Sequence, residues 1–199
     1  YHWFWGRSTE ETQQEIDFFL QRVRGCKMEM PVALDVEQKE LAGLGRDKLT
    51  AYIKQWLDGV KAAGYFPILY ASKAWLTSYI DMSRLLEYDI WIAQYFDRIT
   101  YTGPGNIGMW QYTSSGTISG IAGKVDMNIA YRDFPKIIKD KGLNGWGSGE
   151  NGGSGGSEEG SGGEKDNRLG IGHCVADVLN VRSGPGTDYP VVEYKGNTL

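Results

Sequence analysis

Two carboxylic acids one residue apart, Asp35 and Glu37, are the side chains in this sequence best placed to do chemistry together. They close an apolar run over residues 32–37 that has the composition of a buried strand. Because side chains alternate along a strand, both acids project from one face while Val36 projects from the other. Two acids held close in a partly apolar site cannot both ionise freely, so one pKa rises. A pair of this kind can protonate a leaving oxygen and stabilise the positive charge that develops on carbon.

The D-x-E spacing is a weak signal on its own, because carboxylates at strand ends also serve as caps or as salt-bridge partners. One signature that ends in D-x-E, that of the chitinase-like glycosidases, requires further acids two and five residues before the Asp. This sequence has Ala33 and Met30 at those positions, so that signature is excluded. The pair therefore has to be judged by the elements that position it.

Those elements follow from hydrophobic periodicity and from turn residues. Strands are predicted over residues 1–5, 31–37, 67–71, 89–95, 108–112 and 124–128. Helices are predicted over residues 8–24, 47–63 and 73–79, with a last helix that begins near Pro135. Ser8 and Glu11 have the S-x-x-E spacing of a capping box, and Gly64 suits the end of the second helix.

The order of these segments, strand–helix units followed by bare strands, predicts an α/β fold of the modified TIM-like (β/α) barrel type. Six strands are predicted, whereas a closed barrel of this type needs about eight. We expect the barrel to lack its first two strands, with the chain cut before Tyr1. Functional side chains gather at the carboxyl ends of barrel strands, so Asp35 and Glu37 are expected to project together into a sugar-sized cleft.

Composition divides the chain into three parts and excludes several functions. Residues 1–146 form the predicted barrel domain, 147–168 a flexible acidic linker rich in Gly and Ser, and 169–199 a small all-β module. The net charge of −4 argues against nucleic acid as a partner. No apolar run reaches the roughly 18 residues of a membrane helix, so no membrane contact is expected. Cys26 and Cys174 lie in different halves of the chain and are predicted to be free, buried thiols.

Six blocks in a fixed order carry a family resemblance. They are Tyr1-His2-Trp3, Leu34-Asp35-Val36-Glu37, Gly64-Tyr65 with Leu69-Tyr70-Ala71-Ser72, Trp91-Ile92-Ala93-Gln94-Tyr95, Trp110-Gln111-Tyr112-Thr113-Ser114-Ser115-Gly116 and Val125-Asp126-Met127-Asn128. Together they resemble the family 25 glycoside hydrolases, lysozymes of the Chalaropsis type. The resemblance implies a modified barrel that hydrolyses the β-1,4 bond between N-acetylmuramic acid and N-acetylglucosamine in peptidoglycan, without a metal or cofactor.

The same resemblance implies roles for three acids. Glu37 is similar to the family's general acid, and Asp35 to its partner, which acts either as a nucleophile or as an electrostatic helper through the substrate's N-acetyl group. Asp126 is similar to a further active-site acid, with a strand-end cap as the alternative. The family carries one more acid on its first strand, in a block that this sequence lacks. We therefore expect this chain alone to be weakly active or inactive.

Six more residues are candidates for contact with a sugar: Tyr70, Trp91, Tyr95, Trp110, Gln111 and His2. Aromatic rings stack on sugars at low entropy cost, although core packing is the alternative for each ring. Trp91 and Tyr95 share a strand face, with a small residue between them that leaves room for a sugar. Trp110 and Gln111 project from opposite faces, so at most one of them lines a site. For His2, a hydrogen-bonded place in the core is the alternative.

Residues 169–199 contain a run that resembles the first half of bacterial SH3-like (SH3b) domains, which attach to cell walls. The run is Leu179-Asn180-Val181-Arg182-Ser183-Gly184-Pro185. With this module the sequence predicts a muramidase tethered to an insoluble substrate. The expected partners are peptidoglycan glycan strands and the bacterial cell wall, and the expected location is extracellular or cell-wall-associated. The alternative is a non-catalytic glycan-binding protein, because a purely structural surface domain would leave the strand-end acids without a purpose.

Overall fold

A single sheet positions the acids, and the computed structural model describes it within residues 1–147. Its strands are β1 (His2–Trp3), β2 (Val32–Asp35), β3 (Pro67–Ser72), β4 (Asp89–Ala93), β5 (Asn106–Gly116) and β6 (Val125–Ala130). The helices are α1 (Thr9–Val23), α2 (Arg46–Ala62), α3 (Lys73–Ser78) and α4 (Phe134–Asp140), with short 3-10 turns η1 (Lys39–Leu44) and η2 (Met82–Arg84). The predicted strands and helices are found at their expected places. Of the helices in this described part, none is both long and apolar enough to cross a membrane. The predicted SH3-like module and all but the start of the linker lie outside the described residues.

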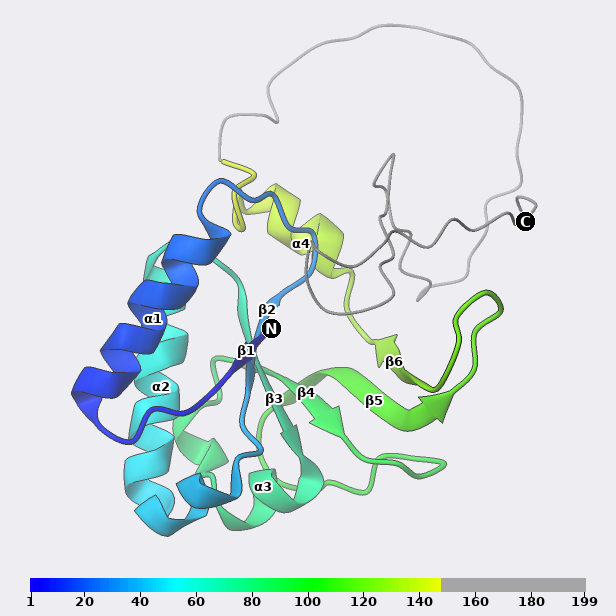
Figure 1. Ribbon diagram of the computed structural model, residues 1–199, viewed down its shortest axis with the longest axis horizontal. Helices are drawn as coiled ribbons and strands as arrows, with labels where there is room; N and C mark the ends of the chain where they lie inside the picture. The colour runs from blue at the N-terminus through cyan, green and yellow to red at the C-terminus, as the bar shows by residue number, and fades with distance from the viewer. Residues whose placement is uncertain (148–199) are drawn as a thin grey trace, which may run out of the picture.

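The strands follow one another across the sheet in sequence order, from β1 to β6 (Figure 1). Strands β1 to β5 are parallel, as the strand–helix units predict. β6 is antiparallel to β5, which departs from the predicted parallel barrel. The connection explains this, because residues 117–124 are too few for a crossover, which takes about a dozen residues or more. Over residues 1–147 the sheet is open, with β1 and β6 at its two edges.

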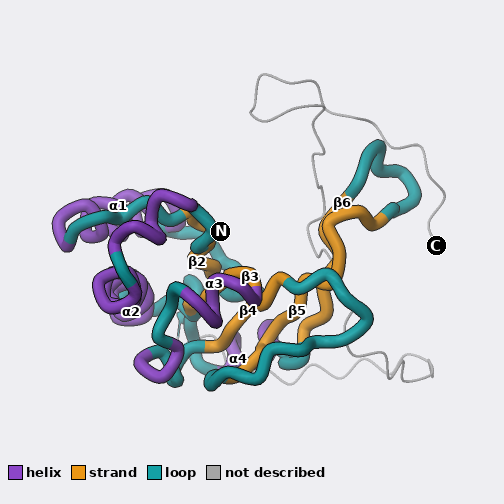
Figure 2. The backbone as a smooth tube through the Cα atoms, turned by 90° about the horizontal axis from the view of Figure 1, so that it is seen from below, coloured by secondary structure: helices purple, strands orange, loops and turns teal. Residues whose placement is uncertain are grey.

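One face of the sheet is covered by α1 and α2, which lie side by side (Figures 1 and 2). Each helix turns an apolar stripe inward, with Ile16 and Phe19 from α1 and Ile53 and Trp56 from α2. Alternate strand residues complete this core: Val32, Leu34, Val36, Leu69, Ala71, Ile90, Ile92 and Trp110. Burial of each large apolar side chain contributes about 1.5–3 kcal/mol, so this layer fixes the helices on the sheet.

The opposite face has an apolar half and a polar half. Toward the amino ends of the strands, Ala33, Ile68 and Met109 pack against Phe134 and Ile138 of α4. Two residues further along each strand, the same face carries the side chains of the candidate site. Apolar packing therefore anchors one end of this face and leaves the carboxyl end to polar groups.

The start of α1 follows the predicted cap. The Ser8 hydroxyl accepts a hydrogen bond from the backbone N–H of Glu11 at 3.1 Å. The Glu11 carboxylate accepts from the backbone N–H of Arg7 rather than from that of Ser8, so the return bond of the capping box is shifted by one residue.

Beyond the end of α1, Cys26 is exposed, which corrects the prediction of a buried thiol. It lies past the last helical residue, Val23, and so outside the packed stripe. Cys174 lies outside the described residues.

Asn144 ties together the segments that lead into two strands. Its side chain accepts a hydrogen bond from the backbone N–H of Phe66 at 2.7 Å, just before β3. It also donates to the carbonyl of Met30 at 2.9 Å, just before β2. The residue is fully buried and holds a φ of 53°, a left-handed conformation that Asn tolerates better than most residues. These two hydrogen bonds fix the amino ends of β2 and β3, the strands that carry Asp35 and Tyr70.

Candidate active site

The acid pair belongs to a row of side chains that crosses the sheet from strand to strand. Trp3 of β1 lies in register with Asp35 of β2, and Asp35 lies in register with Tyr70 of β3. Tyr70 is in turn aligned with Trp91 of β4. Aligned residues of neighbouring strands project from the same face, so these four side chains share one surface. The row stands at the carboxyl end of β2, where the predicted site was expected.

Asp35 is fixed by backbone bonds and shielded from water. Its carbonyl accepts from the N–H of Phe4 at 2.9 Å, and the N–H of Val36 extends the pairing to the carbonyl of Tyr70 at 3.0 Å. Val36 is fully buried on the helix-covered side, which confirms the predicted alternation. Asp35 is 7% exposed, and its Oδ1 is buried without a hydrogen-bond partner among residues 1–147. Burial, together with the charge of Glu37, raises the pKa of Asp35 to about 6.

Glu37 and Asp126 complete an acidic group. Burial raises the pKa of Glu37, and the charge of Asp126 adds to the rise. Glu37 follows β2 and Asp126 lies on β6, so segments far apart in the sequence meet here. Tyr70 lies near all three acids. Burial raises the pKa of its hydroxyl, and the charges of Glu37, Tyr95, Asp35 and Asp126 raise it further. Within the described part of the chain, no group of three or more His, Cys, Asp or Glu side chains is arranged to hold a metal ion.

Three of the predicted sugar contacts form one hydrogen-bonded group. The hydroxyls of Tyr70 and Tyr95 both donate to Oε1 of Gln111, at 3.0 and 2.6 Å. Gln111 is 4% exposed and comes from β5, on the face opposite to Trp110, as the alternation predicts. The two rings are therefore held at their hydroxyl ends beside the acids.

Trp91 leads to a residue that the sequence analysis missed. Its indole N–H donates to Oδ1 of Asn128 at 2.9 Å. Its ring meets that of Tyr70 edge-on, with 5.0 Å between the ring centroids. Asn128 lies two residues after Asp126 on β6, so both side chains belong to the same strand face. The D-x-N spacing within the last of the six sequence blocks was the signal available for it.

Two predicted contacts lie on the helix-covered face instead. Trp110 is part of the core there, and its indole N–H donates to the carbonyl of Gln94 at 2.8 Å. His2 bonds through Nε2 to the carboxylate of Glu15 at 2.8 Å and stacks on Trp56, with 5.5 Å between ring centroids. For both residues the structure supports the core alternative over contact with the substrate.

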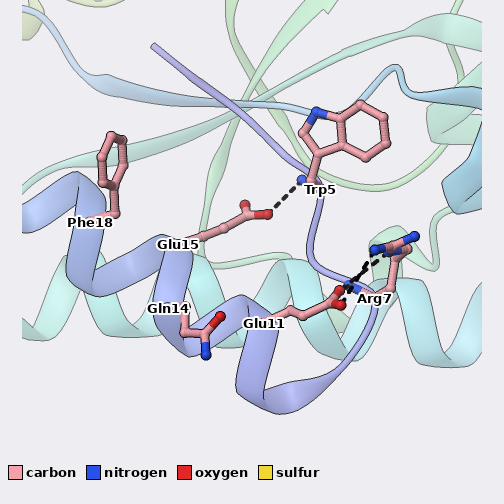
Figure 3. A pocket seen from close by; sticks show the side chains of 6 residues that line it. All are labelled: Trp5, Arg7, Glu11, Gln14, Glu15 and Phe18. Atoms are coloured by element: carbon pink, nitrogen blue, oxygen red, sulfur yellow. Dashed lines mark hydrogen bonds and ion pairs between the residues drawn. The ribbon is translucent and has the colours of Figure 1, made fainter.

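Two surface hollows lie apart from the acids. One, of about 280 Å³, opens between α1 and the segment after β1 (Figure 3). It is lined by Trp5, Arg7, Glu11, Gln14, Glu15 and Phe18. The other, of about 410 Å³, lies near the amino ends of β3 and β4, with Pro67 and Asp89 in its wall. Asp35, Glu37 and Asp126 line neither hollow, so the sugar-sized cleft beside them stays a prediction.

Comparison with known proteins places this geometry in a family. The sequence model of the family described as glycosyl hydrolases family 25 matches residues 1–121, which is more than half of the chain. This chain belongs to glycosyl hydrolase family 25. The resemblance drawn from the six sequence blocks is confirmed at the level of the family, and the mostly parallel six-stranded sheet agrees with solved family 25 structures.

Three relatives show how far the similarity of this family 25 chain extends. The uncharacterized protein YegX of Escherichia coli K12 is 33% identical over 138 residues, which are 65% of this chain and 46% of YegX. A protein of Streptococcus phage B30 named D-alanyl-L-alanine endopeptidase is 28% identical over 156 residues, which are 69% of this chain and 34% of the phage protein. The solved CTP1L endolysin matches with a TM-score of 0.58 and 29% identity, covering 67% of this chain and 46% of the endolysin. The chain thus spans less than half the length of each of these relatives.

Proposed function

We propose that this family 25 chain is a peptidoglycan hydrolase, a muramidase that cleaves the β-1,4 bond between N-acetylmuramic acid and N-acetylglucosamine. One observation carries the proposal: Asp35 ends the parallel strand β2 in register with Tyr70 of β3, and its Oδ1 is buried without a hydrogen-bond partner among residues 1–147. The family match and the similarity to an endolysin support it. The endopeptidase name belongs to a phage protein of which the match covers only 34%.

The reaction needs one acid that holds a proton and one that is ionised. Burial and the charge of Asp126 raise the pKa of Glu37 and so favour its protonated form, which can donate to the leaving glycosidic oxygen. Asp35 acts in its ionised form, which stabilises the positive charge on the sugar, either as a nucleophile or through the substrate's N-acetyl group. The charge of Glu37 helps to raise the pKa of Asp35 to about 6, so in the free protein the two acids compete for one proton. Water completes the hydrolysis and returns a proton to Glu37. Because the two acids act on each other, the working form is the pair that holds one proton.

Product analysis tests this proposal. The full chain is incubated at length with purified peptidoglycan, because slow turnover is expected, and the soluble products are reduced with borohydride and identified by mass spectrometry. A muramidase creates new reducing ends on N-acetylmuramic acid. Glu37→Gln should lower their formation by about 10²–10⁴-fold, the usual effect of removing a general acid. Asp17→Asn, on the exposed side of α1, is the control and should leave product formation unchanged.

Three results would contradict the proposal. New reducing ends on N-acetylglucosamine would indicate a glycosidase of different specificity. New amino groups without new reducing ends would indicate a peptidase. Binding of the wild-type chain and the Glu37→Gln chain to the wall, with no products from either or from a longer form that supplies the first-strand acid, would favour a non-catalytic glycan-binding protein.

We further propose that residues 169–199 anchor the chain to cell walls, and that the protein acts outside the cell or at the wall. The support is the run over residues 179–185 that resembles SH3-like domains. A chain that ends at residue 168 should sediment less with purified peptidoglycan than the full chain, with an unchanged helical signal per molecule in circular dichroism. Equal sedimentation of the two chains would refute the anchoring role.

We also propose that the open sheet corresponds to part of a (β/α) barrel. Strands β1 to β5 are parallel and in sequence order, with helices over one face, which is the pattern of barrel walls. A structure of a longer form of this chain should show further strands paired to β1. A longer form in which β1 remains an edge would refute the barrel.

A further inference from the structure

The amide of Gln111 has a defined orientation, and this carries an inference that rests on the proposed function. Its Oε1 accepts from the hydroxyls of Tyr70 and Tyr95, which together occupy both lone pairs of the oxygen. Neither hydroxyl has another hydrogen-bond acceptor among residues 1–147. If the amide turned over, both hydroxyl protons would lose their acceptor, so Oε1 stays toward the tyrosines.

The amide nitrogen of Gln111 is therefore the group left for a ligand. Nε2 has no hydrogen-bond partner within the described residues, and Gln111 as a whole is 4% exposed. It is not among the buried polar atoms without a partner, which in this part of the chain are Oδ1 of Asp35 and Nε1 of Trp56. Solvent therefore reaches Nε2, and the site presents amide N–H donors on an otherwise buried side chain.

The charges around Gln111 limit which acceptor these donors can bind. Tyr70, which holds Gln111, lies within electrostatic reach of Asp35, Glu37 and Asp126. Such a group of acids disfavours an anionic acceptor such as a carboxylate. A carbonyl is a strong uncharged acceptor, and the acetamido group supplies one in a polymer of N-acetylated amino sugars.

We propose that Gln111 is a specificity-determining residue whose amide N–H donates to an acetamido carbonyl of the glycan. Tyr70 and Tyr95 are positioning residues that hold the amide in this orientation. The three side chains come from β3, from the segment after β4 and from β5, so the donor is fixed by three parts of the sheet before the ligand arrives.

A selectivity measurement tests this inference. The full chain carrying Glu37→Gln, which blocks cleavage, is titrated with chitotetraose and with cellotetraose in a calorimeter. Both sugars are uncharged and β-1,4-linked, but only chitotetraose carries acetamido groups. Gln111→Met has a similar shape and no donor, so it should weaken chitotetraose binding by about tenfold and cellotetraose binding by less than about twofold.

Three more variants test the positioning role of the two tyrosines. Tyr70→Phe or Tyr95→Phe alone leaves one hydroxyl to hold the amide and should remove a small part of the preference. The double variant should remove nearly all of it, which is a non-additive loss.

Gln94 offers a matched control. It is 5% exposed, and its backbone N–H donates to the carbonyl of Gln111 at 3.1 Å. Its amide is satisfied at both ends: Nε2 donates to the carbonyl of Arg98 and to Oγ1 of Thr100, and Oε1 accepts from the N–H of Thr100. Gln94→Met should lower the melting temperature and leave the ratio of the two sugar affinities unchanged.

Each possible result bears on the inference. An equal loss for both sugars in Gln111→Met would indicate a packing role and would overturn it, while the muramidase proposal would stand. A preference for chitotetraose retained in the double variant of Tyr70→Phe and Tyr95→Phe would mean that the hydroxyls do not orient the amide, which also overturns it. A Glu37→Gln chain that binds neither sugar would overturn it as well, whereas the muramidase proposal is judged separately by the new reducing ends.

Discussion

Replacing Asp35 by Asn should stabilise the protein at neutral pH, although it removes a proposed catalytic group. Asp35 is 7% exposed, and its Oδ1 has no hydrogen-bond partner among the described residues. Burial, with the charge of Glu37, raises the pKa of this carboxyl from 3.8 to about 6. Folding therefore works against the ionised form of Asp35.

The size and sign of the effect follow from this pKa. Below about pH 4, Asp35 is protonated in both the folded and the unfolded chain, and its ionisation contributes nothing. Between about pH 4 and pH 6 the unfolded chain has released this proton while the folded chain still holds it, so the free energy of unfolding falls across this window and stays level above it. A difference of about 2 pKa units, at about 1.4 kcal/mol each, gives about 3 kcal/mol at pH 7. For a chain of this size, that corresponds to roughly 6–12 °C in Tm.

Thermal denaturation followed by circular dichroism between about pH 4 and pH 8 measures the effect. The Tm of Asp35→Asn should equal that of the wild type near pH 4 and exceed it by the amount above at pH 7. Asp97→Asn, at an exposed position, should follow the wild-type curve throughout. If the gain in Tm were the same at both pH values, or absent at pH 7, the argument from buried charge would be wrong. Product formation by Asp35→Asn should nevertheless be lost.

Three other perturbations test the site and the scaffold. Asp126→Asn should move the alkaline limb of the pH–rate profile to lower pH, because the charge of Asp126 raises the pKa of Glu37. Initial rates of reducing-end formation across the pH range would show the shift, and an unmoved limb would separate Asp126 from the general acid. Ser8→Ala should lower the free energy of unfolding in urea by about 1 kcal/mol, since it removes the hydroxyl that caps α1. A change below about 0.3 kcal/mol would mean that this cap adds nothing to stability. Asn144→Ala should cost about 3 kcal/mol in the same assay, because two part-buried backbone groups lose their partners and Ala is strained at the positive φ of this position. A loss near 1 kcal/mol would indicate that water replaces the amide.

Local patterns were enough to place the elements and to sort their side chains by face. Helical periodicity and the S-x-x-E spacing predicted a helix over residues 8–24, and α1 runs from Thr9 to Val23 with Ser8 as its cap. Alternation put Asp35 and Glu37 on the face opposite to Val36, and Gln111 on the face opposite to Trp110. These properties depend on residues within a turn of helix or a few strand positions, so a single sequence contains them.

The partners of each side chain came only from the assembled fold. Strand register sets Tyr70 beside Asp35, and the path after β4 brings the hydroxyl of Tyr95 to Gln111. Packing against α1 places His2 beside Glu15 of that helix, on the face of the sheet opposite to Asp35. The raised pKa of Asp35 arises in the same way, because burial by neighbouring strands shields the carboxyl. Contacts between residues distant in the chain depend on how whole elements pair and pack, which no local pattern specifies.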